Sequence, residues 1–438
     1  MQDRAAIVGA GPAGLTQARV LAGLGVPFTI FERAGDFGGL WNHEDPQSPI
    51  YDSAHLISSR TMTGFADYPM PESWADYPAR DLILDYLRGF AQDYRLAEHT
   101  RFNEGVAQAE PVDGGWRLTT SQGKVEDFRW LIAANGSNRK PLLPHWPGDF
   151  TGTLRHAASY RNANELSGKR VLIVGLGNSG VDIACDATRT AKRVAVSLRR
   201  GYHIIPKHIL GKPADVFAAD SPPMPIWLRQ RIFQLLLRII VGDLSKYGMP
   251  KPDHRLMETH PLLNDQFIHH LRHGDVEILG DIKAFDGADV VFRDGHREAF
   301  DEVIAATGYD WEIPYIAENL LDWDRGRLAP PLSIFPEPAN LFLLSFIESN
   351  GSSFSLFNEM AWVIGRAVLA ERDNPGDYRK LRRLLHETSF DVTGGLHMQG
   401  TDRHVGYLDN KTYRKALLRL KRLMGWPKVE TPPVPAEG

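Results

Sequence analysis

The chain has 438 residues, of which 43% are hydrophobic and 24% are charged, enough for two or three globular domains with a well-buried core. Its 50 basic and 54 acidic residues give a net charge of −4, so nothing in the composition indicates a nucleic-acid partner. The single cysteine, Cys185, excludes an intrachain disulfide and a Cys-x-x-Cys metal site, and we expect a cytoplasmic setting.

The N-terminal residues do not form a secretory signal pattern, because their apolar run passes directly into a glycine loop. No stretch reaches the ~18 apolar residues of a membrane span. The nearest is residues 226–240, which Arg229, Arg231 and Arg238 interrupt. We predict an amphipathic helix there that packs on its own protein, with a helix at a membrane surface or a dimer interface as the less favoured alternative. The sequence does not decide the oligomeric state, and a homodimer stays open.

In chain order, residues 1–49 predict a strand, a glycine loop, a helix, a second strand and a glycine turn, GDFGGLWN. Apolar residues spaced for one helical face predict a helix at 81–94, and short strands follow at 115–120 and 128–136. A second strand, glycine loop and helix begin at Arg170. The proline-rich residues 205–226 have no clear period and predict an ordered loop or insertion.

Strands joined by glycine-containing turns are predicted at 276–285, 289–300 and 301–310. A mixed region follows and ends in a helix at 411–424, and the tail 427–438 is predicted to be disordered. The strand endings WLIAANG and VIAATG have the same form, and each follows one of the glycine loops. This echo predicts two related dinucleotide-binding units.

Each glycine loop has the Gly-x-Gly-x-x-Gly pattern that receives a dinucleotide pyrophosphate: a tight turn, close backbone approach, and close packing of helix on strand. One such match is weak, but here a predicted strand precedes and a predicted helix follows each loop. The alternative is two ordinary strand–turn–helix connections. The loops consist of Gly9, Gly11 and Gly14 in GAGPAG, with Pro12 and Ala13 between them, and of Gly175, Gly177 and Gly180 in GLGNSG.

The residues after the next strand distinguish which nucleotide each loop suits. Glu32 lies 18 positions after Gly14, where a carboxylate accepts hydrogen bonds from ribose hydroxyls and repels a 2′-phosphate. Arg199 lies 19 positions after Gly180, with Arg200 beside it, and a guanidinium suits a 2′-phosphate. The alternative for the two arginines is a solvated basic turn. The first loop therefore suits FAD or NAD and the second NADPH, which implies hydride transfer from NADPH to a flavin.

Between the two units lies FTGTLRHAASYR, residues 150–161, which resembles the Phe-x-Gly-x-x-x-His signature of the flavin-containing monooxygenases. With GAGPAG, GGLW, GLGNSG and ATGY, the resemblance extends from residue 8 to about residue 310, in family order. The chain is similar to the bacterial members of these class B flavoprotein monooxygenases. Tyr160 and Arg161 favour the amine and sulfide oxidisers over the sister Baeyer–Villiger enzymes.

The resemblance implies an α/β fold with two Rossmann-like domains. An FAD domain of residues 1–152 and 307–438 would contain an inserted NADPH domain, residues 153–306, with the active site in the cleft between them. It also implies a mechanism. NADPH reduces FAD, and the flavin then activates dioxygen as a peroxyflavin that oxygenates an amine nitrogen or sulfide sulfur of a small-molecule substrate.

Carried over by position, the resemblance assigns cofactor contacts and no catalytic residue or metal ligand. His156 is interpreted as a hydrogen-bonding residue that fixes the link between the domains, rather than as a ligand or base. Ser58 follows Ile57, where many animal members have an asparagine, and its hydroxyl can compensate or belong to a plain loop. The residues implied for FAD are Gly9, Gly11, Pro12, Ala13, Gly14, Glu32, Gly39, Leu40, Trp41 and Ser58. Those implied for NADPH or the link are His156, Tyr160, Gly175, Gly177, Asn178, Ser179, Gly180, Ser197, Arg199, Arg200, Thr307 and Gly308.

Three alternatives stay open at this stage. A Baeyer–Villiger oxygenase on ketones shares the motifs, and an NADPH-dependent flavin or ferredoxin-type reductase shares the two-nucleotide plan. A disulfide reductase is excluded, because it needs a pair of redox cysteines. The third is a flavin-binding redox sensor without enzymatic activity, since a fold does not fix a function.

Overall fold

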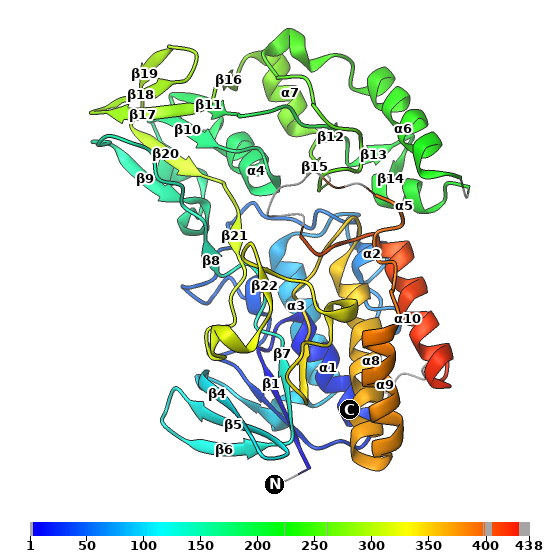
Figure 1. Ribbon diagram of the computed structural model, residues 1–438. Helices are drawn as coiled ribbons and strands as arrows, with labels where there is room; N and C mark the ends of the chain where they lie inside the picture. The colour runs from blue at the N-terminus through cyan, green and yellow to red at the C-terminus, as the bar shows by residue number, and fades with distance from the viewer. Residues whose placement is uncertain (1–2, 223, 261, 397, 399–404, 429–438) are drawn as a thin grey trace. The chain divides into compact units, whose positions relative to one another are not determined.

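The computed structural model describes residues 3–222, 224–260, 262–396, 398 and 405–428 (Figure 1). The chain forms two compact units. Unit 1 consists of residues 1–48, 60–139 and 310–438, and unit 2 of residues 49–59 and 140–309. Apart from the short excursion of residues 49–59 into unit 2, the chain changes units at 139/140 and 309/310, whereas the sequence suggested 152/153 and 306/307.

Each unit is built on a five-stranded parallel sheet. In unit 1 the strand order is β24-β7-β1-β2-β3, and in unit 2 it is β9-β20-β10-β11-β16. The strands of unit 1 are β1 (Ala5–Val8), β2 (Phe28–Phe31), β3 (Thr100–Arg101), β7 (Trp130–Ala133) and β24 (Leu341–Leu343). Those of unit 2 are β9 (Thr153–His156), β10 (Arg170–Val174), β11 (Arg193–Ser197), β16 (Glu277–Leu279) and β20 (Glu302–Ala305).

The two orders match element by element, which confirms the two related α/β units predicted from the sequence. In both, the strand before the glycine loop lies at the centre and the Ala-Ala-x-Gly strand beside it, β7 in one sheet and β20 in the other. The strands β1, β7 and β20 are buried and, apart from Glu302 at the start of β20, apolar, because both faces of a parallel sheet are covered.

One face of each parallel sheet is covered by a small antiparallel sheet. In unit 1 this sheet is β4 (Val106–Val112), β5 (Gly115–Thr120) and β6 (Val125–Phe128), whose Trp116 and Phe128 share a core with Phe31 and Leu131. In unit 2 it is β17 (Ile282–Asp286), β18 (Asp289–Phe292) and β19 (Arg297–Ala299). These strands share a second core with β10 and β11.

Helices complete unit 1. The helix after the first glycine loop, α1 (Pro12–Gly23), packs on the long α8 (Ser353–Asp373), where Gly365 lets the helices approach closely. A Cβ on Gly365 would lie 2.6 Å from a methyl of Leu24. The remaining helices are α2 (Arg60–Thr63), α3 (Arg80–Asp93), α9 (Pro375–Glu387) and α10 (Asn410–Met424).

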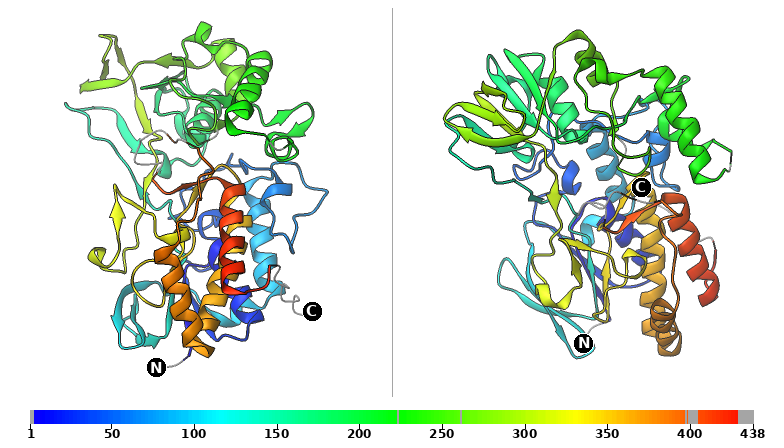
Figure 2. Two further views of the ribbon diagram at one scale, coloured as in Figure 1. Left: turned by 45° about the vertical axis from the view of Figure 1, so that its right-hand side comes forward. Right: turned by 45° about the horizontal axis from the view of Figure 1, so that its top comes forward.

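The corresponding helix of unit 2 is α4 (Asn178–Ala187), which packs on α7 (Gln266–His273). The proline-rich stretch is an ordered insertion, as predicted. Its short strands β12 (Ile204–Ile205), β13 (His208–Ile209) and β14 (Lys212–Pro213) and its helix α5 (Ala214–Ala219) were not predicted, because such short elements have no period in the sequence. Strand β12 pairs with β15 (Leu262–Leu263), and α6 (Ile226–Ile240) follows at the edge of the unit (Figures 1 and 2).

The predicted helices at 81–94, 226–240 and 411–424 are confirmed as α3, α6 and α10. The strands joined by glycine-containing turns that were predicted over 276–310 are present: Gly280 lies between β16 of the parallel sheet and β17 of the antiparallel sheet, and Gly295 lies between β18 and β19. The predicted disordered tail falls mostly on residues 429–438, which lie outside the described residues. None of the helices in the described part of the chain is long and apolar enough to cross a bilayer.

Candidate functional site

The first candidate site is the glycine loop between β1 and α1. Gly9 has a φ of +108°, a backbone conformation that favours glycine, and the N–H of Gly9 donates to the carbonyl of Phe31. A Cβ on Gly14 would lie 1.9 Å from the carbonyl oxygen of Gly9, so only glycine lets α1 begin this close to the strand. Pro12 occupies the first turn of α1, where its missing N–H costs no hydrogen bond.

The second glycine turn lies directly against this loop. Gly39 has a φ of +56°, and a Cβ added to it would lie 2.8 Å from the Cα of Gly11. The N–H of Gly38 donates to the carbonyl of Ala10 at 3.0 Å, and residues 39–41 form a short 3-10 helix that includes Leu40 and Trp41. The two turns thus meet backbone to backbone beside the start of α1, which is the narrow approach that a pyrophosphate requires.

Glu32 closes the same loop from the end of β2. Its carboxylate is buried and accepts hydrogen bonds from the N–H of Ala10 at 2.7 Å and of Ala34 at 2.8 Å. Burial raises the pKa of Glu32, and these two backbone hydrogen bonds oppose the rise. A carboxylate has about four lone-pair positions, so two further acceptor positions fit ribose hydroxyls.

Unit 2 repeats the loop between β10 and α4. Gly175 has a φ of +95°, Gly177 caps α4, and a Cβ on Gly180 would lie 2.3 Å from the carbonyl oxygen of Gly175. A Cβ on Gly175 itself would lie 2.8 Å from the carbonyl oxygen of Ala306, which follows β20. As in unit 1, the first turn of the helix lies against the loop, and the loop lies against the residue that follows the neighbouring strand.

The two units differ after their second strands, and the strand register aligns them. Val8 pairs with Phe31 in unit 1, and Val174 pairs with Ser197 in unit 2. The counterpart of Glu32 is therefore the buried, apolar Leu198. Arg199, which the approximate spacing from the glycine loop matches to Glu32, lies one residue further on.

The side chains next to Leu198 differ from one another in exposure. Arg199 is exposed, and Arg200 is half-buried and has an interaction partner. Ser197 is buried, and its hydroxyl donates to the carbonyl of Gly280 at 2.8 Å. Unit 2 thus has no carboxylate at the position of Glu32, and an exposed guanidinium follows directly.

One orphaned acceptor lies at each loop. The Oδ1 atoms of Asn178, the first residue of α4, and of Asn42, which ends the 3-10 helix of unit 1, are buried and accept no hydrogen bond from the described residues. A buried acceptor without a partner costs about 1–3 kcal/mol. Both loops therefore fit a bound ligand that donates hydrogen bonds, as a dinucleotide does through its hydroxyl and amide groups.

His156 ends β9 and joins it to the exit of β20. Its Nδ1 accepts from the N–H of Ala158 at 3.0 Å, so Nε2 carries the proton and donates to the carbonyl of Gly308 at 3.0 Å. Burial lowers the pKa of His156 below its ordinary value. The next residue but one after β20, Thr307, donates to the carbonyl of Leu142. The geometry agrees with a structural, hydrogen-bonding role for His156 within unit 2.

Tyr160 lies deeper in unit 2 than the sequence suggested. Its side chain is fully buried, and its hydroxyl donates to the carboxylate of Asp186 in the last turn of α4. Burial, more than this carboxylate, raises the pKa of Tyr160. Tyr160 therefore presents no exposed atom to a ligand. Ser58 is half-buried and Ile57 is exposed, both on the segment 49–59 that belongs to unit 2.

A buried hydrogen-bond chain that the sequence did not reveal holds this segment. The hydroxyl of Tyr51 donates to Asp182 of α4 at 2.8 Å and interacts with the side chain of Ser179 in the glycine loop. Asn264 donates to the other oxygen of Asp182 at 2.9 Å, and burial raises the pKa of both Asp182 and Tyr51. Because these residues are far apart in sequence, no local pattern could have identified the chain.

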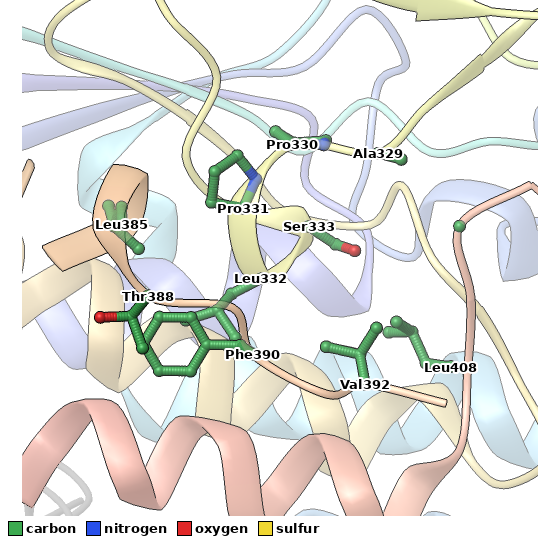
Figure 3. Close-up of a pocket in the computed structure, with 11 residues that line it drawn as sticks. Ala329, Pro330, Pro331, Leu332, Ser333, Leu385, Thr388, Phe390, Val392 and Leu408 are labelled. Carbon is green, nitrogen blue, oxygen red and sulfur yellow. The ribbon is translucent and has the colours of Figure 1, made fainter. Parts of the chain in front are cut away.

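A further pocket of about 300 Å³ lies in unit 1 (Figure 3). Most of its lining side chains are apolar, Ser333 and Thr388 contribute side-chain hydroxyls, and polar atoms make up a large part of the exposed lining. It shares no residue with either glycine loop. Its lining residues are Ala329, Pro330, Pro331, Leu332, Ser333, Leu385, Thr388, Phe390, Val392, Gly406 and Leu408.

Comparison with known proteins identifies the family. Residues 2–371 match the model of the FMO-like family, described as flavin-binding monooxygenase-like. The chain belongs to this family. It is a flavin-dependent monooxygenase, and FAD and NADPH are the cofactors typical of its relatives.

Among individual proteins, the chain is 32% identical over 323 residues to a probable indole-3-pyruvate monooxygenase, YUCCA9, of Arabidopsis thaliana, covering 70% of this chain and 75% of the relative. It is 32% identical over 377 residues to human flavin-containing monooxygenase 5, covering 80% of this chain and 70% of the relative. A flavin-containing monooxygenase from Stenotrophomonas maltophilia has the same fold. The TM-score is 0.67 at 20% identity, over 85% of this chain and all of the other.

The tautomer of His156 generates a pH prediction. Since its folded-state pKa lies below the ordinary 6.5, the unfolded chain binds the proton first as pH falls, and stability declines below about pH 6.5. In His156→Asn, the Asn Oδ1 can replace Nδ1 as acceptor but nothing titrates, and the bond to Gly308 is lost. We expect the variant to be about 1 kcal/mol less stable at pH 8. The gap should narrow toward pH 5 in urea unfolding; a gap that stays constant would contradict a neutral, buried His156.

Proposed function

We propose that unit 1 binds FAD and unit 2 binds NADPH, and that the enzyme transfers one oxygen atom of dioxygen to the nitrogen or sulfur of a small soft nucleophile. The observation that carries the nucleotide assignment is the contrast after the second strands. A buried carboxylate, Glu32, stands where ribose hydroxyls are recognised, whereas Leu198 and the exposed Arg199 follow β11. A 2′-phosphate is repelled at the first position and attracted at the second.

In this proposal the backbone around Gly9, Gly11 and Gly14 receives the FAD pyrophosphate at the start of α1, where the helix dipole favours an anion. Gly39, Leu40 and Trp41 border the cofactor. The loop of Gly175, Gly177 and Gly180 receives the NADPH pyrophosphate in the same way, and Asn178 offers its orphaned oxygen as an acceptor. Arg199, assisted by Arg200, pairs with the 2′-phosphate, and Ser197 positions this turn through Gly280.

The bound flavin, once reduced, supplies the electrons with which dioxygen yields one oxygen atom to the substrate and one to water. The protein holds the two nucleotides and fixes the segments around the second glycine loop. The Tyr51–Asp182 hydrogen bond fixes segment 49–59 to the start of α4, and His156 fixes the exits of β9 and β20. A cytoplasmic setting completes the proposal.

A second candidate is oxygenation at the carbonyl of a 2-oxo acid. The relative from Arabidopsis thaliana is named for indole-3-pyruvate. This chain also has the apolar Ile57 where many animal members have an asparagine, so it lacks their side-chain amide at that position. Baeyer–Villiger oxygenation of a ketone belongs to the same class of carbonyl reactions.

Product analysis distinguishes these reactions. The flavin-loaded enzyme is supplied with NADPH and ¹⁸O-labelled dioxygen together with trimethylamine, thioanisole, cyclohexanone or indole-3-pyruvate. We expect faster NADPH oxidation with the amine or sulfide and one labelled oxygen in the N-oxide or sulfoxide. Labelled products from only the ketone or the oxo acid would replace the first candidate by the second. No labelled product from any of the four would contradict both.

The flavin assignment predicts the effect of one added methyl group. In Gly11→Ala the φ of −80° is unstrained, and the new Cβ would lie 3.4 Å from the Cα of Gly39, an ordinary contact. The protein should fold, but the methyl group blocks the approach of the pyrophosphate, so the purified variant should retain less than about half the flavin of the wild type. In the control Gly35→Ala, the Cβ meets Asn103 at 3.5 Å and flavin content should be unchanged. Full flavin content in Gly11→Ala would contradict the assignment.

The NADPH assignment predicts that one substitution changes KM for NADPH but not KM for NADH. Arg199→Ala removes a charge-assisted hydrogen bond worth about 1.5–3 kcal/mol, so KM for NADPH should rise about ten- to a hundredfold while KM for NADH stays nearly constant. The maximal rate of flavin reduction should hardly change, because the phosphate contributes uniform binding. Arg33→Ala, the register-equivalent position of unit 1, is the control and should not alter KM for NADPH. Equal use of NADH and NADPH by the wild type would refute the assignment.

A further inference from the structure

The helix α6 has one face packed against unit 2. Phe233 and Leu237 are buried on this face, and the ring of Phe233 contacts that of Phe217 with centroids 5.9 Å apart. The buried Gln230 donates to the carbonyl of Leu256 at 2.9 Å. This packed face confirms the prediction that the helix packs on its own protein.

The opposite face of α6 is also apolar, and it is exposed. Ile232, Leu235 and Ile239 are 45%, 61% and 73% exposed. Their spacing of three and four residues places them on one stripe of the helix. At the N-terminal end Trp227 is 53% exposed. Single exposed apolar residues need no explanation, but a stripe along one helix indicates an interaction surface.

The charges on α6 all have one sign. Arg229, Arg231 and Arg238 lie on the helix, and residues 226–240 contain no aspartate or glutamate. None of the three forms an ion pair with a carboxylate in the described part of the chain, and Arg231 lies over the ring of Trp227 at 5.8 Å. The first carboxylate beyond the helix, Asp243, accepts from the N–H of Ser245. The stripe is therefore bordered by cations.

A further exposed apolar side chain belongs to the neighbouring hairpin. Leu210, at the tip between β13 and β14, is 79% exposed and has a φ of +51°, which leaves its side chain outside the hairpin packing. The preceding residue, Ile209, packs in the same apolar cluster as Leu236 of α6. The hairpin and the helix are thus parts of one packed insertion, seen side by side in Figure 1.

We propose that the exposed stripe of Ile232, Leu235 and Ile239 docks on the surface of an anionic lipid bilayer, with the exposed Trp227 at the start of the helix and Leu210 of the adjoining hairpin as further apolar contacts. An aromatic residue, a stripe of aliphatic residues and flanking arginines are the composition of a helix that lies in the bilayer interface, where arginines reach the phosphates. A second copy of the chain fits less well. A two-fold antiparallel pairing through the stripe would bring Arg231 of one copy near Arg238 of the other, with no carboxylate on either helix.

Flotation with vesicles tests the proposal on the flavin-loaded, full-length enzyme. We expect the protein to bind vesicles of phosphatidylcholine with 30% phosphatidylglycerol, to bind pure phosphatidylcholine more weakly, and to be released by salt. Leu235→Glu with Ile239→Glu should lower the partition coefficient at least about tenfold, because two apolar anchors become charged. Each of Arg231→Gln and Arg238→Gln should lower binding to anionic vesicles about fivefold.

Two controls make the result decisive. Val125→Glu places the same charge on a comparably exposed apolar residue of unit 1 and should leave vesicle binding unchanged. NADPH oxidation by the α6 variants should equal that of the wild type, which shows that they fold. The proposal is overturned if the wild type does not float with anionic vesicles, or if Leu235→Glu with Ile239→Glu floats as well as the wild type. It is also overturned if that variant changes only the oligomeric state in light scattering, since the face then belongs to a second copy.

Discussion

Both units depend on one steric constraint, the contact between the first turn of a helix and the turn that precedes it. Gly14 lies against the carbonyl of Gly9, and Gly180 lies against the carbonyl of Gly175, at distances where no Cβ fits. The contact places each helix start directly beyond the end of the central strand. The unpaired N–H groups of the first helical turn and the positive end of the helix dipole therefore face the loop. The backbone alone thus forms a frame that suits an anion, and in the proposed assignment the surrounding side chains select the nucleotide.

The two units have the same arrangement of strand, glycine loop and helix, but they differ in the residues that follow the second strand. The hydrogen bonds are equivalent, because the N–H of Gly9 donates to Phe31 and that of Gly175 donates to Ser197. One residue further on, a buried carboxylate in unit 1 corresponds to a leucine in unit 2. Glu32 can remain buried because two backbone N–H groups compensate part of its desolvation. In the proposed assignment, this difference at one register position is what distinguishes the FAD loop from the NADPH loop.

Unit 2 has two additions that its counterpart lacks. The segment 49–59 is held against α4 by the hydrogen bond from Tyr51 to Asp182. The insertion between β11 and β16 carries α6, a helix with a packed apolar face and an exposed apolar face. Such a helix packs on its own unit through one face and still exposes apolar surface on the other.

The sequence by itself determined the fold class, the two-fold repeat, the family and the positions of the long helices, because glycine spacing and apolar periodicity are local signals. It also located both loops and the carboxylate of Glu32. Only the tertiary structure decided that Leu198, rather than Arg199, is the counterpart of Glu32, since strand register is set by pairing and not by counting from a glycine. It alone revealed the Tyr51–Asp182–Asn264 chain and the buried position of Tyr160, which depend on contacts between distant residues. For α6 the apolar spacing predicted an amphipathic helix. Which of its apolar residues are covered depends on what the rest of the unit packs against the helix, and the periodicity of fifteen residues does not contain that information.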